Sequence, residues 1–523
     1  MAKFRGIVKP AQSGKTREVI HEILKDMEEN TQHIHLVISS NNILLMEQST
    51  SRMNKELIIH KGTANERHIL ATSWDSKTNK CSREALAKKC LSGKIELIGA
   101  CGNGMRMAHV IMLINTLSNQ NFKGKIKLWI DEADRVINIW WRYAMYLSKT
   151  DMIETVVLIT ATYQKIANNF CRNGIPLRIK PLRETYNKET YFGCEDCNAV
   201  LHDNDGTSVY YTEYLFGLYP EMTEPGVKAF IPADIKVVSH NMMADMLFQR
   251  GFAVFLLNGD SKVLRLPDGK THEIVNFRTG NEEVGLTMRR MYNTFECHNY
   301  PVAVTGFLCI GRGLTFQSPG FVFDYGVIST RGCNRSELYQ IAGRVAGNIR
   351  QYPDFKPTKL YTSKNVYDKI LEEEQIAKNL GYIAYENGTE IITQLDVQRA
   401  CFKKEYDAYE IDTHIIEHAF NSSDPVPPKE VYAHLKDTNN SYKPHKYNKK
   451  RMTITEGKKF WTTKGAIQDL KNVVKEIEMQ RPTVALAKPL KIGESQTRLY
   501  HGYKNTQDPS SLTFVVRTVK KVK

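Results

Sequence analysis

The sequence lacks the features that mark membrane and secreted proteins. No apolar stretch approaches the roughly 18–20 uncharged residues needed to cross a bilayer. The first six residues contain no apolar run of the kind found in a signal peptide. We therefore expect a soluble intracellular protein of the cytoplasm, the nucleus or a virus factory, not secreted and without a membrane partner.

Cysteine is also sparse. The 523 residues include 10 cysteines, and they are scattered without the spacing of a disulfide framework, which favours free thiols in a reducing compartment. One CxxC pair occurs, at Cys194 and Cys197. A structural zinc site needs a second pair at suitable spacing, and none is visible, so two thiols in a loop are favoured over a metal site.

An acidic excess is absent as well, and the positive charge is unevenly placed. The formal net charge is +15, and residues 421–523 hold 21 Lys and Arg against 9 Asp and Glu. The other 420 residues are nearly balanced. A basic module beside a near-neutral body suggests a polyanionic partner, most simply nucleic acid. The alternative is a solvated basic tail that only aids solubility.

Short apolar runs alternate with amphipathic segments along most of the chain. This alternation predicts an α/β fold with two parallel sheets. Expected strands in the first half are Phe4–Lys9, His35–Ser39, Ile95–Gly99, Ile126–Ile130 and Thr155–Ile159, with helices over Thr16–Glu28 and Ile43–Ser51. Expected in the second half are strands Val227–Ile231, Ala253–Leu257, Pro301–Thr305 and Gly320–Tyr325 and a helix over Asn241–Arg250.

These patterns predict five parts. We expect a first lobe over 1–172, a connector over 173–226 with a hairpin near 203–206, a second lobe over 227–362, a helical segment over 363–420, and a small basic αβ module over 421–523. The Pro-rich and Ser-rich stretch 421–428 is the best linker candidate.

The strongest local signal is the segment Lys9–Thr16, which follows an expected strand and opens an expected helix. Gly14 permits a tight turn whose backbone N–H groups face phosphate oxygens, and the helix N-terminus adds partial positive charge. Lys15 would reach the β- and γ-phosphates, and Thr16 would bind Mg²⁺. Lys9 occupies the first glycine position of the full pattern, so a tight turn with an incidental lysine is the alternative.

A second signal is the acidic sequence Asp131-Glu132-Ala133-Asp134 at the end of an apolar strand. The carboxyl edge of a parallel sheet is where ligands sit in such folds. Asp131 would bind Mg²⁺ through water, and Glu132 would orient or deprotonate the attacking water. The alternative is that these acids cap the next helix.

Several short motifs together resemble those of superfamily 2 helicases, in family order over residues 4–350. The matching segments are Pro10–Thr16, Ser39–Asn41 with Leu45 and Gln48, Asp131–Asp134, Thr160–Thr162, Asn258–Asp260, Thr305–Gly306 with Gly311–Thr315, and Gln340–Arg344. The resemblance implies two RecA-like lobes with Mg²⁺-ATP between them.

The resemblance also implies a role for each matched residue. Gln12, Ser13, Gly14, Lys15, Thr16 and Gly313 would bind ATP, with Thr16 and Asp131 holding the metal. Glu132, Arg344 and Gln340 would be catalytic, with Arg344 as an arginine finger. Thr160 and Thr162 would couple hydrolysis to lobe movement, and Ser39, Gly102 and Thr305 would contact the nucleic-acid backbone.

The sequence departs from the family pattern at three places. Gly347 stands where a second arginine of the last motif is usual, which leaves Arg312 and Arg350 as candidate substitutes. Gln12 replaces a common glycine. No adenine-reading glutamine motif fits before Lys15, so the chain does not match the DEAD-box helicases proper and is more similar to divergent helicases of phages and large DNA viruses.

The C-terminal module interleaves lysines and aromatics over 442–451, a composition suited to phosphates and stacked bases. Phe460 and Trp461 could stack on bases or belong to a small core, with core favoured for Trp461. A helix with Leu470, Val473, Val474 and Ile477 on one face and a strand over Ser511–Val519 are expected.

The sequence therefore predicts a nucleic-acid helicase or translocase driven by ATP, with DNA or RNA as its partner and possible protein partners in a replication, repair or transcription complex. One alternative is an ATPase subunit that clamps or remodels a nucleoprotein complex without unwinding. A binding scaffold with a dead ATP site is disfavoured by intact Lys15, Asp131, Glu132 and Arg344.

Overall fold

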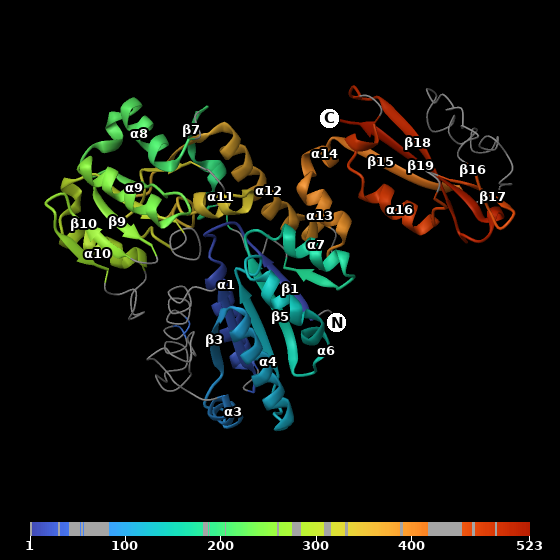
Figure 1. The fold of residues 1–523 in the computed structure, drawn as a ribbon, viewed down its shortest axis with the longest axis horizontal. Coiled ribbons are helices and arrows are strands. Elements are labelled where there is room, and N and C mark those ends of the chain that lie inside the picture. Colours follow the sequence, from blue (N-terminus) through green and yellow to red (C-terminus); the bar gives the residue numbers. More distant parts are fainter. Residues whose placement is uncertain are drawn as a thin grey trace. The chain divides into compact units, whose positions relative to one another are not determined.

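A computed structural model describes most of the chain. The described residues are 3–29, 32–40, 53, 56, 83–180, 187, 189–203, 206–258, 261–274, 284–307, 315–329, 333–386, 391–416, 452–462, 466–486 and 489–523. They form two compact units, Met1–Ile392 and Thr393–Lys523. The first unit contains two large sheets, and the second contains the smaller sheet drawn in orange and red in Figure 1.

The first sheet is built from six parallel strands in the order β3-β2-β4-β5-β1-β6. Its strands are β1 (Phe4–Val8), β2 (Ile34–Ser40), β3 (Leu97–Gly102), β4 (Ile126–Asp131), β5 (Ile153–Thr160) and β6 (Leu177–Ile179). The helices are α1 (Lys15–Glu29), α3 (Arg83–Leu91), α4 (Gly104–Asn119), α5 (Ile137–Trp140), α6 (Ala144–Lys149) and α7 (Gln164–Arg172), with a 3-10 turn η1 (Trp141–Tyr143). The apolar face of α1 packs on the sheet through Val19, Ile23 and Met27, as the 3.6-residue spacing predicts.

The second sheet has the order β11-β10-β9-β12-β8-β13-β14-β7. Its strands are β7 (Asn198–His202), β8 (Lys228–Phe230), β9 (Ala253–Leu257), β10 (Lys262–Arg265), β11 (Thr271–Glu273), β12 (Val302–Gly306), β13 (Tyr325–Ile328) and β14 (Lys359–Ser363). The hairpin β10–β11 is antiparallel, whereas the pairs from β9 to β7 are parallel. Its helices are α8 (Ser208–Leu218), α9 (Val237–Gln249), α10 (Val284–Thr294), α11 (Arg335–Ala342) and α12 (Lys364–Glu386), with 3-10 turns η3 (Cys194–Asp196), η4 (Pro220–Thr223) and η6 (Cys297–Asn299).

The α/β fold class and its parallel sheets are confirmed, but three expectations differ from the structure. Residues 173–226 are not a plain connector, because they supply β6 to the first sheet and β7 and α8 to the second lobe. The strand expected over 320–325 begins only at Tyr325, after a tight bridge between Ser318 and Phe321. The expected strand over 95–99 is shifted to Leu97–Gly102. The helix expected over 43–51 lies outside the described residues.

The second unit has a three-stranded antiparallel sheet in the order β15-β19-β18. Its elements are α13 (Gln394–Cys401), α14 (Lys403–Asp407), β15 (Tyr409–Ile416), β16 (Met452–Thr455), β17 (Lys458–Trp461), α16 (Leu470–Met479), η8 (Thr483–Ala485), β18 (Ser495–Tyr503), η9 (Pro509–Ser511) and β19 (Leu512–Lys521). In Figure 1, α16 lies along this sheet, and its buried residues Leu470, Val473 and Ile477 pack on Val515.

The structure revises the expected organisation of this region. Residues 363–420 do not form one helical segment, because α12 ends the first unit and β15 pairs with β19 of the second. The basic module therefore begins at Thr393, ahead of 421. Phe460 is a core residue whose ring packs edge-on against Tyr503, while the side chain of Trp461, the segment 442–451 and the linker candidate 421–428 lie outside the described residues.

Two further features are reported for the described residues alone. No helix among them is long and apolar enough to cross a membrane. Cys194 and Cys197 are buried beside η3, and burial raises the pKa of both thiols. No third metal-binding side chain joins them in the part of the chain that the structure describes.

Candidate ATP site between two lobes

The phosphate loop connects β1 to α1 at the carboxyl edge of the first sheet. Gln12 (φ 57°) and Gly14 (φ 87°) adopt left-handed backbone conformations, which Gly14 tolerates because it has no Cβ. Ser13 closes the loop, since its Oγ donates to the carbonyl of Pro10 at 2.7 Å. The Lys15 ammonium donates to the same carbonyl at 3.3 Å. The lysine at the first helical position thus folds back onto the loop between β1 and α1, and its predicted contact with phosphates stays a prediction.

The two predicted carboxylates lie at the end of β4, facing this loop. Asp131 is the last residue of the strand, and its Oδ1 accepts a hydrogen bond from the Glu132 backbone N–H at 3.0 Å. Glu132 is buried and has a left-handed backbone (φ 50°), a conformation that costs free energy for any residue with a Cβ. Burial and the neighbouring Glu132 charge raise the pKa of Asp131 to about 7, against the opposing effect of Lys15. The site therefore carries negative charge that a cation would stabilise.

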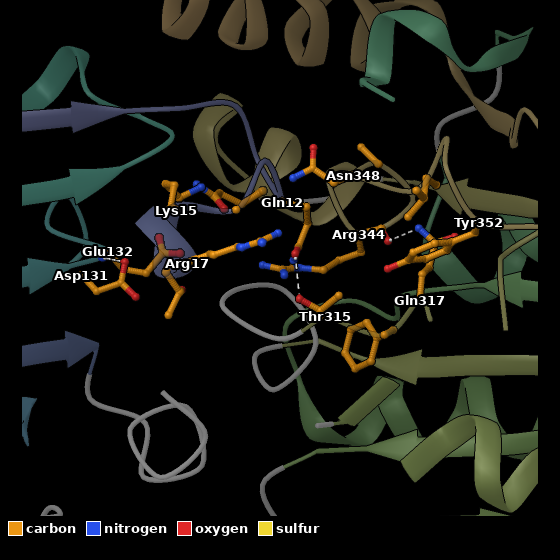
Figure 2. A pocket seen from close by; sticks show the side chains of 17 residues that line it. Gln12, Lys15, Arg17, Asp131, Glu132, Thr315, Gln317, Arg344, Asn348 and Tyr352 are labelled. Carbon is orange, nitrogen blue, oxygen red and sulfur yellow. Dashed lines mark hydrogen bonds between the residues drawn. The ribbon is translucent and has the colours of Figure 1, made fainter. Parts of the chain in front are cut away.

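The second lobe contributes Gln340 and Arg344, which are both buried. α11 is fixed at its start by a capping box in which Asn334 and Glu337 exchange hydrogen bonds, and this places Gln340 in its last turn. Figure 2 shows Arg344 reaching toward the side of the pocket formed by Lys15, Asp131 and Glu132. One pocket is lined by Gln12, Gly14, Lys15, Thr16, Arg17, Asp131, Glu132, Thr315, Phe316, Gln317, Gln340, Arg344, Ala346, Gly347, Asn348, Ile349 and Tyr352.

The structure brings together most of the residues predicted for ATP. Gln12, Gly14, Lys15, Thr16, Asp131, Glu132, Gln340 and Arg344 all line this pocket. Ser13 does not line it, because its side chain is turned back onto the loop. Gly313 lies outside the described residues. The predicted roles of these residues stay predictions.

The predicted coupling residues lie directly behind the carboxylates. Because β4 and β5 are neighbours, Thr160 at the end of β5 reaches Asp134, and its Oγ1 donates to Asp134 Oδ1 at 2.6 Å. The backbone N–H of Thr162 in turn donates to Thr160 Oγ1 at 3.1 Å. All three residues are buried, so these hydrogen bonds join the two segments away from solvent, and the predicted coupling stays a prediction.

Arg17 is a pocket residue that the sequence analysis missed. It occupies the third position of α1, and Figure 2 shows its side chain directed toward Arg344. No carboxylate pairs with Arg17 among the described residues. Its position two residues after Lys15, on a helix that begins at the pocket, was the available signal.

Arg350, one candidate for the missing second arginine, does not line the pocket. Its Nε donates to the Tyr191 carbonyl at 2.7 Å, and its Nη2 pairs with Asp196 at 3.0 Å. Its guanidinium also lies 5.4 Å from the centre of the Phe192 ring. Arg312, the other candidate, lies outside the described residues. Arg17 is therefore the additional arginine that the described pocket contains.

Two tyrosines outside the first lobe also form hydrogen bonds with the backbone of the phosphate loop. The Ala11 N–H donates to the Tyr339 hydroxyl at 2.8 Å, and the Tyr191 hydroxyl donates to the Ala11 carbonyl at 2.9 Å. A Cβ placed on Gly343 would lie only 2.4 Å from the Cβ of Ala11. No sequence pattern indicated this contact, because 180 or more residues separate Ala11 from its partners.

The residues predicted to contact nucleic acid lie outside this pocket. Ser39 is the second-last residue of β2, Gly102 ends the neighbouring strand β3, and Thr305 lies in β12. The side chains of Ser39 and Thr305 are fully buried. These hydroxyls do not reach solvent in this structure, and the predicted contacts stay predictions.

The donor set at the pocket suits a hard divalent cation. Asp131 supplies a carboxylate, Thr16 a hydroxyl, and both line the same pocket. Oxygen ligands of this kind, completed by phosphate and water, are those that Mg²⁺ prefers.

No protein-family model matches the chain, and no curated protein matches it. Among solved structures, S. cerevisiae Dbp5 bound to RNA and ADP BeF3 has 13% identity and a TM-score of 0.42, over 76% of this chain and 89% of that chain. The DEAD-box helicase Mss116 bound to ssRNA and UDP-BeF has 12% identity and a TM-score of 0.42, over 77% and 82%. The ATP-dependent Type ISP restriction-modification enzyme LlaBIII bound to DNA has 9% identity and a TM-score of 0.45, over 76% of this chain and 29% of that chain.

These likenesses concern architecture alone. The assignment of the fold rests on this chain's own topology, in which two mostly parallel sheets follow each other within residues 4–363. Residues from four of the predicted motif segments, at Lys15, Asp131, Thr315 and Gln340, line one pocket. The described chain therefore has an α/β fold with two successive, mostly parallel sheets and one pocket lined by residues of both lobes.

Proposed function

We propose that the chain hydrolyses ATP between its two lobes and uses the resulting movement to translocate on or unwind a nucleic acid. The observation that carries the proposal is the single pocket in which Lys15, Asp131 and Glu132 of the first lobe meet Gln340 and Arg344 of the second. Groups from two lobes that close over one nucleotide make lobe movement depend on its hydrolysis.

Each residue has a distinct role in this proposal. The loop amides and Lys15 bind the phosphates, and Glu132 orients the attacking water. Arg344 stabilises the charge that develops on the transferring phosphoryl group. Thr16 and Asp131 would hold Mg²⁺, which supplies charge neutralisation when bound with ATP. Thr160 and Asp134 pass a change at Glu132 into β5, because their side chains are hydrogen-bonded behind it.

The test is ATP turnover by the full chain, measured with and without single-stranded DNA or RNA. Stimulation by either polymer is expected, and the polymer that stimulates more identifies the substrate class. A duplex-unwinding assay then separates a helicase from an ATPase that remodels a nucleoprotein complex. The absence of turnover with both polymers would contradict the proposal.

Two substitutions assign that turnover to this pocket. Lys15→Ala and Glu132→Gln should each lower turnover by at least about 100-fold, the scale of removing a catalytic base or an oxyanion donor. Nucleic-acid binding without ATP should persist in both variants, because neither Lys15 nor Glu132 is among the residues predicted to contact nucleic acid. Wild-type turnover in either variant would place the reaction elsewhere.

A further inference from the structure

Four arginines gather around the C-terminal end of α16 in the second unit, although they are widely separated in the sequence. Arg498 and Arg517 are direct cross-strand partners in β18 and β19. Arg481 follows α16 by two residues, and Arg399 lies in the last turn of α13, which packs against α16. We call Arg399, Arg481, Arg498 and Arg517 the arginine cluster. Figure 1 shows the elements that carry it.

Arg517 forms the buried base of the arginine cluster. It is only 2% exposed, and its Nη2 donates to the Gln480 carbonyl at 2.8 Å. The Tyr500 hydroxyl donates to Gln480 Oε1 at 3.2 Å, and the Tyr406 hydroxyl donates to the Gln480 carbonyl at 3.4 Å. Gln480 is therefore held by three donors, while Arg517 Nε has no partner among the described residues. This network fixes the end of α16 beneath the other arginines.

The positive charge of the arginine cluster is not balanced by acids. Among the described residues, no carboxylate forms an ion pair with any of the four arginines. The adjacent Glu405 is engaged elsewhere, because it accepts the Thr483 backbone N–H at 2.7 Å. Like charges directly opposite on neighbouring strands destabilise a sheet, and a buried cation without a counter-ion is costly. Burial, with a contribution from Arg498, lowers the pKa of Arg517.

The other arginines are accessible and partly preorganised. Arg399 and Arg481 are exposed, and Arg498 is half-buried. The Arg481 guanidinium stacks over the Phe402 ring at 4.3 Å from its centre. A guanidinium held flat on an aromatic face keeps its N–H groups free for a phosphate, which it binds with two parallel hydrogen bonds.

We propose that the arginine cluster binds the phosphate backbone of a nucleic-acid strand, with Arg399, Arg481 and Arg498 on the phosphates and Arg517 and Gln480 positioning them. A bound phosphate supplies the counter-charge that the fold lacks. The partner is a polyanion of many charges, because residues 393–523 carry 24 Lys and Arg against 15 Asp and Glu. The inference rests on the proposed function for the identity of that polyanion, but its residues lie outside the ATP pocket.

The experiment measures the affinity of the full chain for a labelled single-stranded oligonucleotide, as DNA and as RNA, across a salt series without ATP. The test variant is Arg481→Gln combined with Arg498→Gln. The matched control is Lys471→Gln combined with Lys475→Gln, which removes two exposed positive charges from α16 outside the arginine cluster. Thermal melting of each variant checks that the fold is retained.

The test variant should bind roughly tenfold or more weakly near 0.15 M salt. The slope of log affinity against log salt should fall by about 0.7 for each phosphate of a single strand that the variant no longer neutralises. The control should keep a slope closer to that of the wild type. A wild-type slope in the test variant, while nucleic acid still stimulates ATP turnover, overturns this inference and leaves the proposed function intact. A wild-type chain that binds neither polymer overturns both.

Discussion

At the scale of single residues, the guanidinium of Arg17 is the least expected part of the candidate ATP pocket. It lies on the first turn of α1, beside Lys15 and directed toward Arg344. Because Gly347 occupies the usual position of a second arginine and Arg350 is held by Tyr191 and Asp196, Arg17 is placed to supply that charge from the opposite lobe.

Replacing Arg17 should therefore lower the rate of ATP turnover more than the affinity for ATP. We expect Arg17→Ala to reduce kcat by roughly 10²-fold, the effect of losing one donor to a developing negative charge, with a smaller change in KM. Lys25→Ala, which removes an exposed charge from the same helix, should change neither. Steady-state kinetics of both variants would measure this, and an unchanged kcat in Arg17→Ala would exclude the assignment.

A second residue-level prediction concerns Asp26, which is buried at the end of the first sheet opposite the pocket. Burial alone would raise the pKa of this carboxyl, but hydrogen bonds from His35, Lys127 and His33 outweigh it and lower the pKa well below its usual value. A depressed pKa stabilises the fold above the unfolded value, about pH 4, and that contribution is lost as the pH falls further.

Asp26→Asn should therefore be less stable than the wild type by roughly 1.5–3 kcal/mol at pH 7. The difference should be similar at pH 5 and should narrow at pH 3, because the carboxyl of the unfolded wild-type chain then takes up a proton while that of the folded chain stays ionised. Urea denaturation followed by tryptophan fluorescence at the three pH values measures it. His35 and Glu154 are present in both proteins, so they do not distinguish the two. If the difference in the free energy of unfolding between wild type and variant is the same at all three pH values, the ionised Asp26 carboxylate does not stabilise the fold in this way.

Sequence could identify those pocket residues that belong to a short local pattern. Lys15 and Thr16 follow a glycine turn between a strand and a helix, and Asp131 and Glu132 end an apolar strand, so short-range patterns were enough. Tyr191 and Tyr339 could not be found this way. Their contacts with Ala11 depend on which surfaces meet after folding, and nothing in their flanking residues indicates them.

At the scale of elements, α11 and the phosphate loop lie in close contact at Gly343 and Ala11. The chain turns at Gly343 directly against Ala11, and an added Cβ would lie 2.4 Å from the Ala11 Cβ. Gly343 itself has an ordinary helical backbone (φ −57°), so space and not conformation requires glycine there.

Gly343→Ala should push the two lobes apart at this point and lower ATP turnover, at an overpacking cost of about 1–3 kcal/mol. Adding Ala11→Gly removes the opposing methyl group and should restore part of the turnover. Ala11→Gly alone is the control for added loop flexibility. Turnover and nucleotide affinity of the three variants complete a double-mutant cycle, and strictly additive effects would show that the two positions are not in contact.

Elements with strong periodicity were predictable, and those shaped by distant pairing were not. The buried runs of β4 and β9 and the amphipathic α1 match their patterns. β6 is three residues long and β15 is mostly exposed, so neither has a clear pattern of its own. Both are strands because of a neighbour far along the chain, β1 for the former and β19 for the latter.

At the scale of the whole molecule, the boundary at Ile392 and Thr393 gives a direct test of the two units. A chain ending at 392 should keep basal ATP turnover and bind nucleic acid with a flatter salt dependence, because the arginine cluster is gone. A chain ending at 420 should aggregate more, since it retains β15, with its exposed Ile411 and Ile415, but lacks β19. Size-exclusion chromatography compares the aggregation of the two chains, and oligonucleotide titration measures the salt dependence of their binding. Equal aggregation of the chains ending at 392 and at 420 would contradict the boundary.

The order of strands in the second unit also has a consequence for synthesis on the ribosome. β19 is the central strand of the sheet β15-β19-β18, yet it is the last of the three to be translated. Neither outer strand can pair until those ten residues have left the exit tunnel. The two lobes can complete their sheets earlier, so a nascent chain would acquire its candidate ATP pocket before its arginine-rich module, and a premature stop late in the message would affect the module alone.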